Sequence, residues 1–204
     1  MSLQLPDDHF LIIGLGNPGP EYAGTRHNFG FMCLDSLQKK LVPPSSFKYV
    51  KDYQSEIAGS KLAGVSVGLL KPQTFMNLSG RTAQAVLADH PALDPQKIVV
   101  VHDDLDLPLG RLKLKNGGGS GGHNGVGSLI EGFGSPEFLR LRLGISGALR
   151  RVDTVDYVLS PFLESEKKVV LEVLEKSVTG LMLLLTSGVT AAMNQINRRV
   201  VEST

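Results

Sequence analysis

His27 is the residue whose surroundings most clearly suggest chemistry. It lies near the end of a segment rich in glycine and proline, residues 14–28, which reads GLGNPGPEYAGTRHN and follows an apolar run. Glycine and proline at this density interrupt strands and helices, so the segment predicts a loop, and loops on rigid flanking elements commonly display reactive side chains. At the start of the helix expected next, the helix dipole favours a neutral imidazole, which a general base requires.

Asp103 is a candidate partner for His27. Residues 98–101 are four apolar β-branched residues in succession and predict a strand, and Asp103 follows it closely. A carboxylate that accepts a hydrogen bond from one imidazole nitrogen fixes the tautomer and leaves the other nitrogen free to activate water. The alternative is a surface or capping histidine, and contact between the two side chains decides between these interpretations.

Three asparagines lie in predicted loops or near helix starts, and they could hold a substrate: Asn17, Asn77 and Asn124. Amide side chains can donate to a developing oxyanion and can pair with a peptide backbone. The structural alternatives are an N-cap for Asn77 and a flexible loop for Asn124, which follows a glycine tract. Because no serine or cysteine nucleophile accompanies them, the pattern favours water as the attacking group.

Basic residues alternate along two predicted strands. Lys113 and Lys115 lie on one strand and Arg140 and Arg142 on the other, so each pair projects from one face. Such a stripe is commonly a solvated surface. Beside a glycine tract it could also bind the phosphates of a nucleic acid end, with Tyr22 stacking on a base or sugar.

A dinucleotide site is a weak interpretation of the first loop. Residues 14–19 match the pattern G-x-G-x-x-G after a predicted strand. Pro18 and Pro20 delay the following helix, however, and Asp35 falls in a helix where the pattern requires an acid at the end of a second strand. The sequence therefore disfavours a nucleotide cofactor.

A metal site is the second weak interpretation. The group of His102, Asp103, Asp104 and Asp106 could bind a divalent metal, but the spacing of known metal motifs is missing. Asp104 and Asp106 are expected instead to be solvated or to form a turn.

Alternating strand and helix patterns must position these residues. Buried or alternating runs predict strands at residues 10–15, 49–58, 65–71, 98–101, 111–115 and 138–145. Helical spacing predicts helices at residues 27–42, 77–89, 128–133, 164–186 and 189–201. The interleaving predicts a layered α/β fold, and the adjacent strands at 49–58 and 65–71 suggest a hairpin and hence a mixed sheet. Ligands of such sheets lie beyond the carboxyl ends of the strands.

Composition limits the class of protein. The 204 residues predict a single domain over the whole chain, and 42% hydrophobic with 20% charged residues is typical of globular proteins. With a formal net charge of only +1, any polyanion must be bound by a local basic patch. The single cysteine, Cys33, lies in an apolar helical pattern and is expected to be buried. No membrane span or secretory signal is recognisable, so we expect a cytoplasmic location.

Four segments together resemble the bacterial-type peptidyl-tRNA hydrolase family. They read GLGNPGPEYAGTRHN, KPQTFMNLSG, HDDLDLPLG and GGGSGGHNG in this order, and LRLRLGI at residues 139–145 extends the likeness over nearly the whole chain. The resemblance implies a single-domain, three-layer α/β/α fold with a twisted mixed central sheet, a monomer, and a mobile segment that closes over the cleft. It also implies hydrolysis of the ester between a peptide and the 3′ ribose of tRNA, which recycles tRNA during translation, without a cofactor or metal.

The resemblance further implies a role for each matching residue. His27 would be the general base and Asp103 its orienting partner. Asn17 would position the terminal region of the substrate, with Tyr22 nearby at the CCA end of the tRNA. The second and fourth motifs would hold the peptide and polarise the carbonyl, through Phe75, Met76, Asn77 and Asn124. The phosphates of the acceptor stem would lie near Lys113, Lys115 and Arg142.

One position departs from the family's pattern. Ser120 occupies a site in the glycine tract where some members carry histidine, which could alter loop mobility or pH response but leaves His27 and Asp103 in place. Two alternatives are a non-catalytic RNA-binding relative on the same scaffold and a metal-dependent hydrolase built on His102, Asp103 and Asp106. The intact pair of His27 and Asp103 argues against the first.

Overall fold

One mixed sheet forms the centre of the molecule. A computed structural model describes residues 9–147 and 153–198. The strands are β1 (Phe10–Gly14), β2 (Lys48–Val50), β3 (Ser55–Leu62), β4 (Val65–Pro72), β5 (Ile98–Pro108), β6 (Leu112–Asn116) and β7 (Leu139–Ser146). They follow the order β2-β3-β4-β1-β5-β7-β6. The pairs β1–β4, β1–β5 and β5–β7 are parallel and the outer pairs are antiparallel, so the predicted mixed sheet is confirmed.

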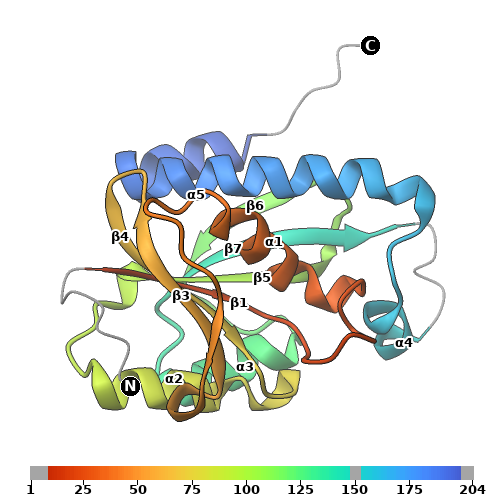
Figure 1. The fold of residues 1–204 in the computed structure, drawn as a ribbon. Helices are drawn as coiled ribbons and strands as arrows, with labels where there is room; N and C mark the ends of the chain where they lie inside the picture. The colour runs from red at the N-terminus through yellow and green to blue at the C-terminus, as the bar shows by residue number, and fades with distance from the viewer. Residues whose placement is uncertain (1–8, 148–152, 199–204) are drawn as a thin grey trace.

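Helices cover both faces of this sheet. They are α1 (Phe29–Gln38), α2 (Gly80–Asp89), α3 (Asn124–Phe133), the short α4 (Thr154–Leu159) and α5 (Lys167–Ile196). In Figure 1, α1 and α5 lie on one side of the sheet and α2 and α3 on the other. Alternate residues of β1 enter two different apolar cores, Ile12 with α1 and α5, and Leu11 and Ile13 with α2 and α3. The predicted three-layer α/β/α architecture is therefore confirmed, and β1 is buried on both faces because it is central.

Two glycines allow α1 to begin directly against the sheet. A Cβ atom on Gly14 would lie 2.6 Å from the carbonyl oxygen of Gly30, and one on Gly30 would collide with the backbone of Leu15 and Val101. Only glycine permits so close an approach of helix to strand. Because Val101 lies two residues before Asp103, this contact places the start of α1 beside the strand that carries the acid.

Several predicted elements differ in extent from the observed ones. The strand expected to end at Val101 continues to Pro108, so the acidic residues lie within β5 rather than in a loop; the pairing register with β7 shifts between Asp104 and Pro108. Helix α3 begins at Asn124 rather than near residue 128, because His123 caps it.

The break expected between the two C-terminal helices lies at Gly188, whose backbone is not helical, within the segment labelled α5. The last residues of the predicted helix at 189–201 lie outside the described part of the chain. Helix α4 has no counterpart among the predicted elements. Cys33 is buried as expected, and burial raises the pKa of its thiol to about 12. Among the described residues, none of the helices is both long and apolar enough to cross a membrane.

Candidate active site

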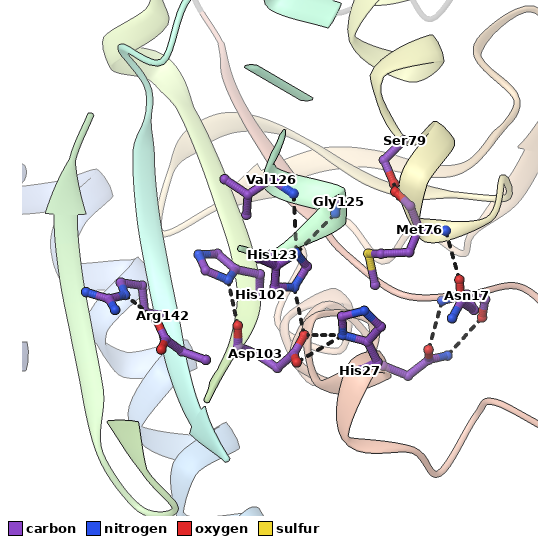
Figure 2. Close-up of polar contacts among 12 residues, drawn as sticks. Asn17, His27, Met76, Ser79, His102, Asp103, His123, Gly125, Val126 and Arg142 are labelled. Atoms are coloured by element: carbon purple, nitrogen blue, oxygen red, sulfur yellow. Dashed lines mark hydrogen bonds and ion pairs between the residues drawn. The ribbon is translucent and has the colours of Figure 1, made fainter. Parts of the chain in front are cut away.

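His27 and Asp103 are in contact, a point that the sequence left open. His27 belongs to a 3₁₀ turn, Arg26–Asn28, immediately before α1, and Asp103 lies on the neighbouring strand β5. The Nδ1 atom of His27 lies 3.0 Å from both carboxylate oxygens of Asp103 (Figure 2). A carboxylate only accepts, so Nδ1 carries the proton and donates. In a neutral ring this fixes the tautomer with Nε2 unprotonated, which is the form that a general base needs.

A second histidine, His123, holds the same carboxylate. Its Nε2 atom lies 2.9 Å from Asp103 Oδ1, while its Nδ1 accepts from the backbone amides of Gly125 and Val126 at the start of α3. In Figure 2 the two imidazoles converge on Asp103. Accepting at Nδ1 and donating at Nε2 defines the neutral tautomer of His123. Sequence reasoning missed this residue, because it placed the start of the helix near residue 128 and left His123 inside the glycine tract, whereas α3 begins directly after His123.

The environment keeps Asp103 ionised and His102 neutral. Burial by itself would raise the pKa of Asp103, but the attraction and hydrogen bonds of His123 and His27 outweigh it and hold that pKa well below its usual range. Burial, reinforced by His123, lowers the pKa of His102 to about 3. His102 Nδ1 donates to the carbonyl oxygen of Asp103 at 2.7 Å, so this histidine braces the backbone of the acid.

The cluster also resembles a metal site in its spacing. Ligand atoms of His27, Asp103 and His123 lie within 4.8 Å of one another. A metal bound at Nε2 of His123 would require a proton on Nδ1, and that proton would face the amides of Gly125 and Val126. The donor set therefore fits a hydrogen-bonded relay and does not fit a metal. The alternative site of His102, Asp103 and Asp106 does not form such a cluster, because within the described part of the chain only His27, Asp103 and His123 bring three ligand atoms this close together.

Asn17 joins the first and second motifs. Its backbone N–H and C=O pair with the side-chain amide of Asn28 at 2.8 and 2.9 Å, and its Oδ1 accepts from the backbone N–H of Met76 at 2.8 Å (Figure 2). Asn17 and Met76 are both buried. With Oδ1 committed to Met76, the side-chain NH₂ of Asn17 is the group that can donate to a substrate.

A cavity of about 370 Å³ opens beside His27, Asp103 and His123. Its walls include residues from three of the sequence motifs and from both basic strands: His27, Asp103, His123, Asn124, Lys115 and Arg142. The short helix α4 forms part of the wall through Thr154, Val155 and Val158. His27, Asp103, His123, the side chain of Asn124 and two basic residues thus face one space.

Other residues predicted to contact the substrate are not among the described residues that line this cavity. Phe75 and Asn77 are exposed on or next to the 3₁₀ turn Met76–Leu78, Tyr22 is half-buried, and Lys113 is exposed on β6. The N-cap interpretation of Asn77 is wrong, because Ser79 occupies that position in α2. The flexible-loop interpretation of Asn124 is also wrong, since it is the first residue of α3.

The basic strands are less solvated than expected. Arg140 is buried and donates to the carbonyl oxygens of Gly118, Gly119 and Pro136, so it organises the glycine tract. Arg142 pairs with Asp104, whose side chain is only 9% exposed and therefore not solvated. The turn that was the other expectation for Asp104 is present, because its Oδ1 accepts from the backbone N–H of Asp106 at 2.9 Å. The strands pair Lys113 with Arg142 and Lys115 with Arg140, so all four cations project from one face of the sheet.

Comparisons with known proteins identify the family of this chain. The family model described as peptidyl-tRNA hydrolase matches residues 11–204. Peptidyl-tRNA hydrolases of Synechococcus sp. (strain JA-3-3Ab) and Aquifex aeolicus are 46% and 43% identical, covering 92% and 93% of this chain and 82% and 96% of those proteins. A crystal structure of the Acinetobacter baumannii enzyme superposes with a TM-score of 0.83 at 35% identity, over 96% of this chain and 97% of that one. The chain belongs to the peptidyl-tRNA hydrolase family.

Proposed function

We propose that this chain hydrolyses the ester bond between a peptide and the 3′ ribose of tRNA, with His27 as the general base and Asp103 as its orienting partner. One observation carries the proposal: His27 Nδ1 donates to Asp103 at 3.0 Å at the wall of a cavity that Lys115 and Arg142 also line. A base with a fixed tautomer beside fixed positive charge suits an ester whose leaving group belongs to a polyanion.

In this mechanism water is the nucleophile. As its oxygen attacks the ester carbonyl, His27 Nε2 takes the proton, and Asp103 stabilises the imidazolium that forms. The tetrahedral intermediate then collapses, the bond to the ribose oxygen breaks, and the imidazolium returns the proton to that oxygen. His123 keeps the carboxylate aimed at His27 through its bond to Oδ1. The cycle releases free peptide and free tRNA and restores neutral His27.

Amide groups would stabilise the negative oxygen and bind the peptide. Asn124 lines the cavity at the start of α3, and Asn17 can donate through its NH₂ group. The exposed side chains of Phe75 and Asn77 flank Met76, which Asn17 holds, and they offer a surface for the peptide beyond the scissile bond. Free aminoacyl-tRNA should be a poorer substrate, because it has no peptide bond to pair with these amide groups and leaves their hydrogen bonds unmade.

The tRNA would lie across the basic face. Lys115 and Arg142 line the cavity and Lys113 is the cross-strand neighbour of Arg142, so phosphates of the acceptor stem can bridge from the cavity along β6. Tyr22, in the loop after β1, would stack near the CCA end. We further propose that the chain acts as a monomer in the cytoplasm and recruits neither cofactor nor metal for catalysis.

The decisive experiment is hydrolysis of N-acetylaminoacyl-tRNA by the purified chain in excess EDTA. Turnover is expected, and His27→Ala should lower it about 10²- to 10⁴-fold while tRNA binding is largely retained. His90→Ala is the matched control, because His90 follows α2 and lies outside the cavity wall. A near-normal rate for His27→Ala would contradict the mechanism. Loss of all activity in EDTA would favour a metal-dependent hydrolase, and tRNA binding without any turnover would favour the non-catalytic RNA binder.

A further inference from the structure

Arg26, the residue before His27, is completely buried and has no role in the mechanism above. Its guanidinium reaches the segment that follows α4, more than a hundred residues away along the chain. Nη1 donates to Ser160 Oγ at 3.0 Å and to the carbonyl oxygen of Pro161, and Nη2 donates to Glu166 Oε2 at 2.6 Å. An arginine fork that engages an acid and two further acceptors fixes both partners in one geometry.

The backbone makes the same connection. The N–H of Arg26 donates to the carbonyl oxygen of Ser160 at 3.0 Å, and Thr25 pairs with Pro161 as an isolated antiparallel bridge. The rings of Tyr157 and Phe162 cover the guanidinium at 4.6 and 5.1 Å. In Figure 1, α4 accordingly lies beside the loop that leads from β1 into α1.

The two connected segments, the turn Arg26–Asn28 and α4, contribute different parts of the cavity. The turn Arg26–Asn28 carries His27, whereas α4 forms the wall through Thr154, Val155 and Val158. Val155 is 59% exposed, whereas Tyr157 and Val158 are buried, so one side of α4 packs on the core and the contacts at its C-terminal end add to this packing. Tyr157 supplies one more such contact, through its hydroxyl bond to the carbonyl oxygen of Ile145 at 2.6 Å.

We propose that Arg26 is a positioning residue that joins α4 to the turn of His27, so that the cavity wall and the general base move as one unit. When α4 is seated against a substrate, the tie through Ser160, Pro161 and Glu166 holds the imidazole at its distance from Asp103. This inference rests on the proposed function for its kinetic consequence. The physical coupling of the two segments can be measured without substrate.

Two substitutions weaken the interaction of Arg26 with Glu166, one at each residue. Arg26→Lys keeps the positive charge but replaces the planar guanidinium by a single ammonium. Glu166→Gln removes the carboxylate charge that Arg26 Nη2 contacts and keeps the shape of the side chain. Glu164→Gln is the matched control for the second, because Glu164 lies in the same 3₁₀ turn with its side chain 86% exposed. Arg111→Lys is the control for the first, since Arg111 also joins two segments through backbone carbonyls, those of Asn197 and Arg198.

Amide hydrogen exchange and steady-state kinetics are the paired measurements. Arg26→Lys and Glu166→Gln should speed exchange both in residues 154–159 and in residues 26–28. They should also lower kcat on N-acetylaminoacyl-tRNA about 10- to 10²-fold, more than they raise KM, because the base is displaced. The two control variants should change neither measurement.

Each contrary outcome is distinct. Faster exchange in α4 alone, or an unchanged kcat despite faster exchange in both segments, would reduce Arg26 to a structural anchor and overturn the proposal. A wild-type chain without hydrolase activity would overturn the proposed function instead. In that case exchange decides the coupling by itself: a response of both segments supports it and a response of one segment refutes it.

Discussion

His123 Nε2 lies 2.9 Å from Asp103 Oδ1, and this oxygen also lies 3.0 Å from His27 Nδ1. One buried carboxylate therefore accepts from two imidazoles, which belong to the turn before α1 and to the start of α3. Both donors stabilise the ionised acid, and the acid in turn fixes the proton of each ring. The geometry of His27 and Asp103 thus depends on three elements that meet at the side chain of Asp103.

Asp103→Asn should lower kcat by about 10²- to 10⁴-fold, the range for loss of general-base catalysis. The amide offers a single oxygen acceptor, and its NH₂ group would face a ring nitrogen that now carries a proton, so one histidine must change tautomer or move away. The measurement is kcat on N-acetylaminoacyl-tRNA, with the circular dichroism spectrum and melting temperature recorded for the same preparation. A folded variant with normal kcat would mean that His27 needs no orienting partner.

His123→Ala removes two interactions at once, the cap of α3 and the bond to Asp103. Loss of a cap is expected to cost about 0.5–2 kcal/mol of unfolding free energy. The fall in kcat should be smaller than the roughly 10²-fold lower limit for a lost general base, because His123 acts through Asp103.

His123→Asn separates the two effects of that substitution. Asparagine caps helices well but is too short to reach Asp103 from the same backbone position, so stability should recover while kcat stays low. Urea titration and kcat together make the comparison. If kcat recovers along with stability, His123 serves α3 alone.

The sequence predicts the fold more completely than the site, for a physical reason. Apolar periodicity reports burial directly, and so the strands around β1 and the two helical layers can be placed from it. The contact between His27 and Asp103 depends on how the chain folds, because the two residues are 76 positions apart in the sequence. Their residue types suggest a pair, but only the close approach of α1 at Gly30 brings them together.

The errors also have physical causes. The pattern predicts an end to the strand at Val101 because charged residues normally leave a sheet, whereas β5 carries Asp103 inside, stabilised by the two histidines. Alternation predicts a solvated face for Arg140 because it does not reveal that the carbonyls of a glycine tract fold over this side chain. Helix α4 escapes prediction because six residues are too few for a clear apolar period.

Removing charge from the basic face should weaken tRNA binding and flatten its dependence on salt. For each phosphate that the protein no longer neutralises, the slope of log K against log salt is expected to fall by about 0.7 to 0.9. Lys113→Ala and Lys115→Ala test the two exposed lysines of β6, with Lys61→Ala as control, because exposed Lys61 lies on β3 near the other end of the sheet. Arg142→Gln should be combined with Asp104→Asn, so that no carboxylate is left unpaired. Unchanged slopes would mean that these residues form a solvated surface and do not contact the phosphates of tRNA.

Acid should destabilise the protein partly through His102. Burial lowers its folded-state pKa to about 3, from the ordinary histidine value of 6.5 that applies to the unfolded chain. Above pH 6.5 both folded and unfolded chains keep this ring neutral and it has no effect. As pH falls below that value the unfolded chain binds a proton that the folded chain does not, so stability falls by up to about 1.4 kcal/mol per pH unit.

His102→Asn removes this titration and keeps a side-chain donor for the carbonyl oxygen of Asp103. Urea unfolding at about pH 7, 6 and 5 measures the effect. The variant should be less stable than the wild type at neutral pH, because the smaller side chain leaves space in the core, and the gap should narrow as pH falls. Asp103 titrates in both proteins and loses its own contribution only at lower pH, so it does not narrow the gap. Parallel curves for the two proteins would mean that His102 gains its proton as readily in the folded chain as in the unfolded one.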